Sequence, residues 1–446
     1  MKYTTTNKAL HKSKFNFLVP LGKEYYILYN TFSCAIAIID NELKECLDKE
    51  DFSKIPPATL NYLIKQEFIV PSDLDEIKRY LCHFHRSIYD TRNLDYTIIL
   101  TYDCNFACIY CYERLRNIIS PEYMDIETAE RTASYIEKQA KKFEAKNITI
   151  TLYGGEPLLN IKVGLKILNR IKSFCEKNDI KLRLKLITNG SLMSREIVEE
   201  LLNYNLNYIQ ITIDGTKEVH DKRRPFKSKK GSFNTIIKNL LDTVDISPPG
   251  SILIRFTLDK MTYKNFPNFI DYLLSLGLKD KVKLGIGYLT GIPDGSPCAK
   301  WVLEEEDLAR KMFELWKIAM EKGFRYYGKV SHNICAAKAI SSEIIDPKGD
   351  VYKCWGLINN EKFCVRNINE DDYRPIFYEY IERELPQKCK KCNLLPYCSG
   401  GCFEQAYIKT GNPFNITCVN AYRLKVELKL YVMERYRDVL KERGLL

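Results

Sequence analysis

Three cysteines stand close together in the stretch LTYDCNFACIYCYE, which runs from Leu100 to Glu113. Cys104, Cys108 and Cys111 follow a CxxxCxxC spacing, with no fourth cysteine beside them. A 4Fe-4S cube has four irons, and electron-transfer clusters give each iron a cysteine. Three cysteines would therefore leave one iron free to bind an amine and a carboxylate from outside the protein. A structural zinc site would need a fourth Cys or His nearby, for which Glu113 is a poor substitute.

A second set of cysteines lies near the end of the chain. Eight of the sixteen cysteines fall between residues 335 and 418, and CKKCNLLPYCSGGCF is the densest block. Clustered cysteines in a chain without an export signal indicate metal ligands rather than disulfides. Zinc knuckles and iron-sulfur clusters are both compatible with these spacings.

The elements that must position the first set form an alternating pattern. Six apolar runs, separated by helix-like segments, indicate successive βα units and a parallel sheet. Strands are expected at 96–100, 148–153, 182–188, 208–213, 252–258 and 282–288, and helices at 128–143, 163–177 and 266–276. Without a clear seventh and eighth strand, this pattern predicts an α/β fold built on a partial six-stranded barrel. Ligands of such sheets bind at the carboxyl ends of the strands, and the CxxxCxxC motif directly follows the first strand.

Three further motifs end the following strands. They are YGGEPLL (153–159), ITNG (187–190) and ITIDG (211–215). The paired glycines of the first motif offer a bare backbone that can approach a ligand closely. An isolated NG or DG pair is compatible with an ordinary turn, but such motifs on consecutive strand ends favour a binding site.

Together these motifs resemble those of the radical S-adenosylmethionine (SAM) enzymes, most strongly over residues 96–215. The resemblance implies a 4Fe-4S cluster on Cys104, Cys108 and Cys111 whose open iron binds SAM. It also implies that SAM is cleaved to a 5′-deoxyadenosyl radical, which abstracts hydrogen from an unactivated C–H bond. It assigns no catalytic side chain.

The same resemblance implies SAM contacts by position. Tyr110 would pack by the adenine, while the GGEP motif would line the methionine end. The segment VHDKRRP offers Arg223 or Arg224 to a carboxylate of the cofactor or the substrate. The remaining candidates for SAM contacts are Gly154, Gly155, Glu156, Pro157, Thr188, Asn189, Thr212 and Asp214.

The C-terminal cysteines, with IIDPKGDVYKC at 344–354, resemble the SPASM (twitch-type) extension of radical SAM enzymes. This extension binds two further 4Fe-4S clusters, which implies three clusters in all. The family's interleaved ligation gives four cysteines to the distal cluster, Cys389, Cys392, Cys398 and Cys418, and three to the nearer one, Cys335, Cys354 and Cys402. Either Cys364 completes the nearer cluster, or one iron of that cluster stays open and could bind a substrate thiolate.

The resemblance implies a peptide substrate. Residues 1–92 are similar to the small α+β, winged-helix-like modules that capture the leader of a ribosomally made precursor peptide by strand addition. The leading hypothesis is an intramolecular thioether cross-link, with a carbon–carbon or carbon–oxygen link as the main variant. Formylglycine formation, as in anaerobic sulfatase maturases, is an alternative, although Trp355 stands where those enzymes have an acidic residue. A zinc or iron-sulfur interaction protein is the non-enzymatic alternative.

The remaining expectations concern organisation and partners. We expect four parts: the leader-recognition module (1–92), the barrel (93–295), a helical linker (296–330) and the auxiliary-cluster domain (331–446). No apolar run approaches the roughly 18 residues of a membrane span, which predicts a cytoplasmic protein. The net charge of +11 counts every thiol as neutral, and the basic run DKRRPFKSKK lacks interleaved aromatics, so no nucleic-acid partner is expected. A flavodoxin- or ferredoxin-type electron donor is expected.

Overall fold

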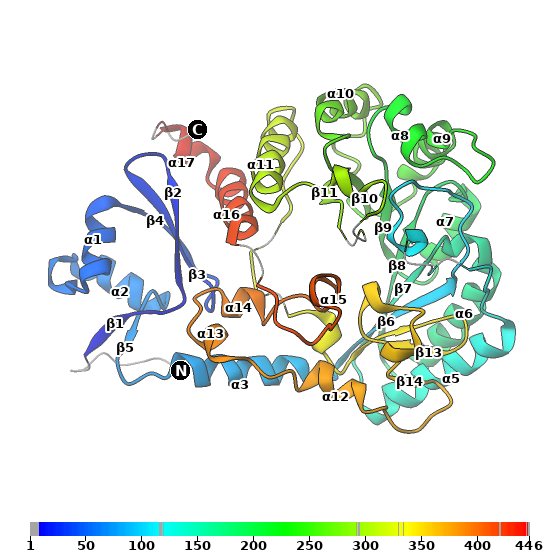
Figure 1. Ribbon diagram of the computed structural model, residues 1–446, viewed down its shortest axis with the longest axis horizontal. Helices are drawn as coiled ribbons and strands as arrows, with labels where there is room; N and C mark the ends of the chain where they lie inside the picture. Colours follow the sequence, from blue (N-terminus) through cyan, green and yellow to red (C-terminus); the bar gives the residue numbers. More distant parts are fainter. Residues whose placement is uncertain are drawn as a thin grey trace.

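The computed structural model describes residues 9–115, 118, 120–290, 292, 295–328, 330–332, 334–418, 421–442 and 444. The first residues of the expected module, 1–8, lie outside the described residues. In the described chain, nine strands form one sheet in the order β11-β10-β9-β8-β7-β6-β12-β13-β14 (Figure 1). The first six in this order are mutually parallel.

These six parallel strands confirm the α/β prediction and match the six predicted strand segments. Strand β6 is buried on both faces, as is usual inside a parallel sheet, and its Ile98, Ile99 and Leu100 are fully buried. Their bounds are β6 (Asn93–Thr101), β7 (Asn147–Gly154), β8 (Lys181–Thr188), β9 (Leu206–Thr212), β10 (Ile252–Leu258) and β11 (Lys283–Tyr288).

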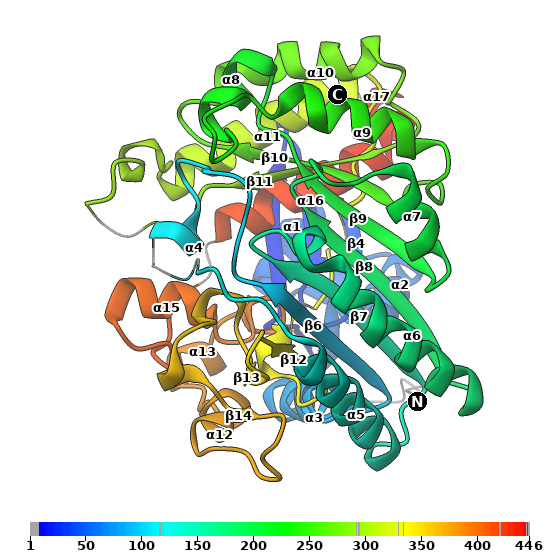
Figure 2. The same cartoon turned by 90° about the vertical axis from the view of Figure 1, so that its right-hand side faces the viewer.

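Helices cover the outer face of this sheet (Figure 2). Each has one buried apolar stripe; in α6 this stripe includes Ile167, Leu168 and Ile171. The three predicted helices are present with shifts of one or two residues at their ends. The covering helices include α5 (Ile126–Lys142), α6 (Ile161–Lys177), α7 (Arg195–Leu202), α9 (Phe233–Val244) and α10 (Phe266–Ser275).

The cysteine-rich tail continues the barrel sheet, which the sequence pattern did not predict. Strand β12 (Ser342–Ile345) pairs in parallel with β6, and β13 (Asp350–Tyr352) and β14 (Arg366–Asn367) extend the sheet further. Ile344 and Ile345 of β12 are buried in the core that the barrel strands share. The tail is therefore held against the first barrel strand rather than joined by a flexible linker.

The N-terminal part contains a three-stranded antiparallel sheet in the order β2-β3-β4. Strands β3 and β4 form a strand-turn-strand unit, and helix α2 leads into strand β5. Helices α1 and α2 cover one face of the sheet, and a separate long helix, α3, runs toward the barrel (Figure 1). The bounds are β1 (Leu10–Lys12), β2 (Asn16–Leu21), β3 (Tyr25–Asn30), β4 (Ile36–Asp40), α1 (Asn41–Lys49), α2 (Pro57–Lys65), β5 (Ile69–Pro71) and α3 (Glu76–Ile88).

The other face of this sheet packs against the C-terminal helix α16 (Ala421–Arg435). Val19, Ile27 and Tyr29 form a buried cluster with Leu424 and Leu428. The two ends of the chain thus share a core. The expected linker contains α11 (Glu305–Glu321), which contacts α10 and α16. Across the described residues, no helix has the length and apolar character to span a bilayer.

Candidate functional site

A cavity of about 390 Å³ lies at the carboxyl ends of the barrel strands. The last residues of β7, β8, β9 and β11 line it: Gly154, Thr188, Thr212 and Tyr288. Its volume is within the range of small-molecule sites. The loop after β6 forms one wall, and segments of the cysteine-rich tail form another.

The loop after β6 brings Cys104, Cys108 and Cys111 to this cavity, and all three line it. Burial raises the pKa of each thiol, to about 12 for Cys111. Thiols in such surroundings persist as thiolates only when a metal holds them. Among the described residues, no three His, Cys, Asp or Glu side chains lie close enough together to enclose a single ion. Three thiols facing one shared space fit a cluster, which is larger than one ion.

Gly154 and Gly155 allow the end of β7 to lie against the cysteine loop. Gly154 has a φ of +140°, and a Cβ there would lie 2.2 Å from the carbonyl oxygen of Thr101. A Cβ on Gly155 would lie 2.3 Å from the carbonyl oxygen of Asp103. Both glycines also line the cavity. The bare backbone expected to approach a ligand is therefore also what lets two strand-end loops pack together.

Glu156 joins two of the predicted motifs from behind the cavity wall. Its carboxylate accepts hydrogen bonds from the Thr188 hydroxyl at 2.8 Å and the Asn189 backbone N–H at 2.7 Å. Burial raises the pKa of Glu156 to about 7, against the lowering effect of these bonds. Thr188 and Asn189 line the cavity, whereas the buried Glu156 and Pro157 are absent from its described lining. Glu156 therefore positions the lining instead of contacting a ligand there.

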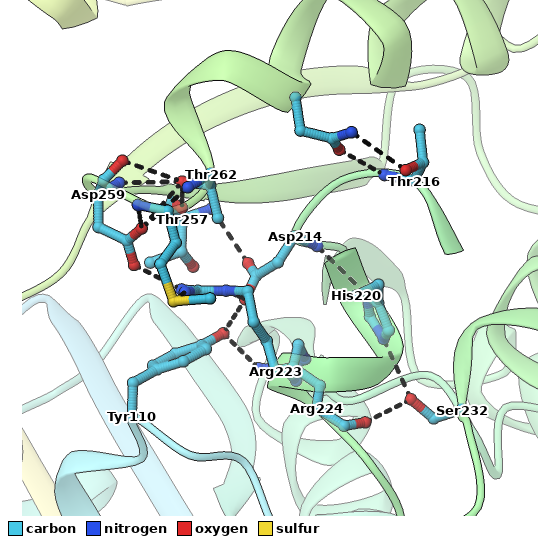
Figure 3. Close-up of polar contacts among 12 residues, drawn as sticks. Tyr110, Asp214, Thr216, His220, Arg223, Arg224, Ser232, Thr257, Asp259 and Thr262 are labelled. Carbon is cyan, nitrogen blue, oxygen red and sulfur yellow. Dashed lines mark hydrogen bonds and ion pairs between the residues drawn. The ribbon is translucent and has the colours of Figure 1, made fainter. Parts of the chain in front are cut away.

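Asp214 and Arg223 lie in a buried ion-pair network beside the cavity (Figure 3). Arg223 donates from Nε to Asp214 at 3.2 Å and from Nη2 to Asp259 at 2.6 Å. Its guanidinium stacks 4.5 Å from the ring centroid of Tyr110. Burial would raise the pKa of Asp214, but Arg223 and Arg224 outweigh it and hold that pKa below its usual range. The structure does not bring Asp214 or Arg223 to the described cavity lining, because the charged groups of both side chains pair with each other and with their neighbours inside the protein.

Arg224 is the arginine of this segment that lines the cavity. Its Nη1 donates to the Tyr110 hydroxyl at 2.9 Å, and that hydroxyl donates to Asp214. The Nε of Arg224 is buried and has no hydrogen-bond partner among the described residues. Tyr110 also lines the cavity, so the network fixes this aromatic ring and presents a cation next to it.

The cavity lining also carries the carboxylate of Glu113, whose place there sequence reasoning missed. Glu113 Oε1 accepts hydrogen bonds from the hydroxyls of Tyr153 at 2.7 Å and Tyr112 at 3.3 Å. The Tyr153 ring lies 4.4 Å from that of Trp355. Burial raises the pKa of Glu113 to about 7, despite these two hydrogen bonds. The available signal was the place of Glu113 two residues after the last cysteine of the cluster motif, in the short helix α4 (Tyr112–Leu115).

The C-terminal cysteines come together in two groups. In one group, the thiol of Cys354 has its pKa raised first by burial and then by the nearby Cys335 and Cys402. In the other, burial raises the pKa of Cys389, with further contributions from its neighbours Cys398, Cys418 and Cys392. We name these the nearer group (Cys335, Cys354 and Cys402) and the distal group (Cys389, Cys392, Cys398 and Cys418). Interleaved ligation would draw on these same residues, and their role as cluster ligands stays a prediction.

Cys364 is placed away from both groups. It is buried, and its thiol donates to the carbonyl oxygen of Arg366 at 3.1 Å. Burial and the neighbouring Asp350 raise its pKa, while Arg374 opposes them. Of the two readings of the nearer cluster, this placement favours the one in which Cys364 is not a ligand.

Comparisons with known proteins agree with this geometry. Residues 98–296 match the Radical SAM superfamily. A cysteine-type anaerobic sulfatase-maturating enzyme of Clostridium novyi is 28% identical over 348 residues, covering 71% of this chain and 90% of the relative. The radical SAM cyclopropyl synthase TigE of Paramaledivibacter caminithermalis is 23% identical over 457 residues, covering 91% and 92%. The crystal structure of Streptococcus suis SuiB bound to its precursor peptide SuiA shares the fold, with a TM-score of 0.55, 15% identity, and coverage of 93% of this chain and 99% of SuiB.

Proposed function

Because this chain is an enzyme of the radical SAM superfamily, we propose that it modifies a ribosomally made precursor peptide. The observation that carries the proposal is the meeting of Cys104, Cys108 and Cys111 with Gly154 and Gly155 on one cavity. Similarity to a sulfatase maturase and to TigE supports a radical SAM reaction, and the fold shared with a peptide-bound SuiB supports a peptide substrate.

The cavity divides into a cofactor half and a substrate half. In the cofactor half, the three cysteines would hold a 4Fe-4S cluster, and Tyr110 and Arg224 would contact SAM. When bound, cluster and SAM together supply a radical that abstracts hydrogen from a C–H bond. Asp214 and Arg223 hold Tyr110 in place from behind, and Glu156 holds the strand-end loops. The other SAM contacts that we propose are Gly154, Gly155, Thr188, Asn189 and Thr212.

The substrate half favours a product linked through sulfur. Trp355 and Gly356, which line the cavity, directly follow Cys354 of the nearer group. A cluster on Cys335, Cys354 and Cys402 would thus border the substrate, with Cys364 engaged elsewhere. One iron of that cluster would be open to a peptide thiolate. We therefore propose an intramolecular thioether as the product, with a second auxiliary cluster on the distal group.

Leader capture is proposed for the outer edge of β4. Among the described strands, β4 pairs only with β3, so its other edge is free to add a strand. Strand β2 also lies at an edge, but it carries the exposed Pro20, which lacks the N–H that strand addition requires. The precursor is expected in a small open reading frame beside the gene.

Leader capture is best tested without deleting residues 1–92. Such a deletion would uncover the apolar face of α16 that packs on β2 and β3. Hydrogen exchange on the full chain avoids this problem. Adding the leader peptide should slow exchange in residues 36–40 and not in residues 16–21. Protection of neither segment would refute capture by strand addition at this sheet.

The reaction itself is tested anaerobically. The reconstituted protein, with a flavodoxin- or ferredoxin-type donor or a chemical reductant, should convert SAM to 5′-deoxyadenosine. The triple variant Cys104→Ala, Cys108→Ala, Cys111→Ala should form none. Mass spectrometry of the peptide should then show loss of two hydrogens with the sulfur retained. Failure of the wild-type protein to cleave SAM would refute the proposal.

Formylglycine formation is the second candidate, supported by the similarity to a sulfatase maturase. Trp355 occupies the position of the expected acid, but the carboxylate of Glu113 lies close by and lines the same cavity. The two products are distinguished by mass, because oxidation of a cysteine to formylglycine loses the sulfur. A carbon–carbon or carbon–oxygen link would leave the cysteine thiol open to alkylation, whereas a thioether would not.

A further inference from the structure

Two cations lie at the nearer and distal cysteine groups. Lys338 is only 1% exposed, and its ammonium donates to the carbonyl oxygen of Ser399. Arg383 donates from Nε to the carbonyl oxygen of Phe414 at 3.1 Å. Both cations lie over the ring of Phe403: the Lys338 ammonium is 5.9 Å and the Arg383 guanidinium carbon 4.7 Å from the ring centroid. The Nη1 of Arg383 is buried and has no partner among the described residues.

The groups able to balance these cations are thiols. In the described chain, neither cation has a carboxylate within ion-pair distance, and their hydrogen bonds go to backbone oxygens. Burial and the neighbouring Arg383 lower the pKa of Lys338 to about 8, against the thiols near it. Those thiols are Cys335, Cys389 and Cys398 for Lys338, and the same three together with Cys402 for Arg383.

These neighbours belong to both groups at once. Cys335 and Cys402 are in the nearer group, and Cys389 and Cys398 are in the distal group. The contacts agree with this placement. The backbone N–H of Lys338 donates to the carbonyl oxygen of Cys335 at 2.9 Å, Ser399 directly follows Cys398, and Phe403, whose ring both cations face, directly follows Cys402. Any charge placed on either group acts on the same two cations.

An aromatic face and a backbone carbonyl can hold one buried lysine without further help. Two like charges side by side, with a buried donor left over, are costly unless an anion is present. Iron-sulfur clusters bound by thiolates supply such negative charge, whereas neutral thiols do not. The cation pair is therefore matched to occupied cysteine groups.

We propose that Lys338 and Arg383 form a cationic bridge that raises the reduction potentials of both auxiliary clusters, an inference that rests on the proposed function. A nearby positive charge stabilises the reduced form of a cluster, which is the more negative form. The Nη1 of Arg383 is the donor available for a hydrogen bond to a cluster sulfur.

In the proposed reaction, the cationic bridge would help to remove the one electron that thioether formation releases. To form a thioether, the carbon loses one hydrogen atom and the thiol loses one proton. Formation of the S–C bond then leaves one electron to be removed. Raised potentials in the two auxiliary clusters favour the transfer of that electron out of the cavity and toward the distal group, from which the oxidised form of the flavodoxin- or ferredoxin-type partner can accept it.

The test is an anaerobic redox titration of the full holoenzyme, followed by electron paramagnetic resonance. Lys338→Gln and Arg383→Gln should each lower the potential of the auxiliary clusters. The expected shift is about tenfold in the equilibrium constant of reduction, or about 59 mV for one electron. The potential of the cluster on Cys104, Cys108 and Cys111 should stay unchanged. Lys362→Gln, at an exposed position, is the matched control.

The charge-keeping variants Lys338→Arg and Arg383→Lys separate charge from packing. If a glutamine variant loses auxiliary iron, its charge-keeping counterpart should retain iron and a potential near that of the wild type. Full iron content with unshifted auxiliary potentials in both glutamine variants would overturn the bridge and leave the proposed function intact. Loss of iron in both members of each pair would also overturn it. Wild-type protein with iron for a single cluster would instead refute the auxiliary clusters themselves.

Discussion

The hydroxyl of Tyr153 donates a 2.7 Å hydrogen bond to Oε1 of Glu113. This bond joins the end of β7 to the short helix α4, which directly follows the CxxxCxxC motif. It holds the Glu113 carboxylate beside Trp355, in the half of the cavity that we assign to the substrate. The motif that we propose to hold the cofactor cluster is thus followed directly by a wall of the proposed substrate site.

Glu113→Gln should uncouple SAM cleavage from product formation. Glutamine keeps the size of the side chain and can still accept from Tyr153, but it removes the charge that a substrate donor would meet. We expect the yield of modified peptide per 5′-deoxyadenosine to fall about tenfold to a hundredfold, the value of one charged hydrogen bond. Glu127→Gln, at an exposed position of α5, is the control. An equal fall in SAM cleavage would instead place Glu113 among the supports of the first cluster.

Arg224→Lys and Arg223→Lys should have different effects. Arg224 lines the cavity, so lysine there should weaken SAM binding by at least tenfold, measured by equilibrium dialysis, with little change in thermal stability. Arg223 bridges Asp214 and Asp259 inside the protein. Lysine has a single ammonium group and cannot contact both carboxylates as the Arg223 guanidinium does.

Removing the charge of Arg223 altogether, in Arg223→Met, would leave two carboxylates without their cation. It should lower the free energy of unfolding by about 3–5 kcal/mol. Chemical denaturation of both arginine variants checks the contrast. The same stability and the same SAM affinity in Arg223→Met as in the wild type would contradict the assignment.

Gly155→Ala should disturb the first cluster. The added Cβ would lie 2.3 Å from the carbonyl oxygen of Asp103, next to Cys104. We expect the cysteine loop to shift and the protein to lose iron from the SAM-binding cluster while keeping the auxiliary iron. Gly277→Ala is the comparison: its Cβ would meet nothing within 4 Å, and although the φ of +66° strains alanine there, the first cluster should keep its iron. Iron content and paramagnetic resonance spectra like those of the wild type would show that the loop tolerates the methyl group.

Cys364→Ser should leave the iron content unchanged. Its thiol donates to the Arg366 carbonyl, and serine can preserve that hydrogen bond. We expect iron for three clusters in both wild type and variant. Loss of about a third of the iron in Cys364→Ser would identify Cys364 as a ligand of an auxiliary cluster.

The barrel strands and the cysteine loop could be predicted from the sequence because their signals are local. Short buried runs mark β6 to β11, and the CxxxCxxC and GGEP motifs follow two of them directly. The choice between Arg223 and Arg224 could not be settled from the sequence, because Arg223 ends a short helix (Lys217–Arg223), Arg224 follows it, and the two side chains face different surroundings. Figure 3 shows how the surrounding acids engage Arg223.

Long-range packing explains the other features that could not be predicted from the sequence. The pairing of β12 with β6 joins residues more than two hundred positions apart, and the contact of β2 and β3 with α16 joins the two ends of the chain. No local pattern in either partner specifies the other. The expected boundaries at residues 92, 295 and 330 stay predictions for the same reason. From the sequence alone, the buried Lys338 and the partly buried Arg383 cannot be told from ordinary surface cations.

The central claim is that a cluster held by Cys104, Cys108 and Cys111 has an open iron that binds SAM. The most direct measurement is the paramagnetic resonance spectrum of the reduced, anaerobically reconstituted protein before and after SAM is added. We predict that SAM changes the spectrum, and that this response disappears in the triple alanine variant while the auxiliary signals remain. A wild-type spectrum that SAM does not alter, or stoichiometric zinc in place of iron, would contradict the account.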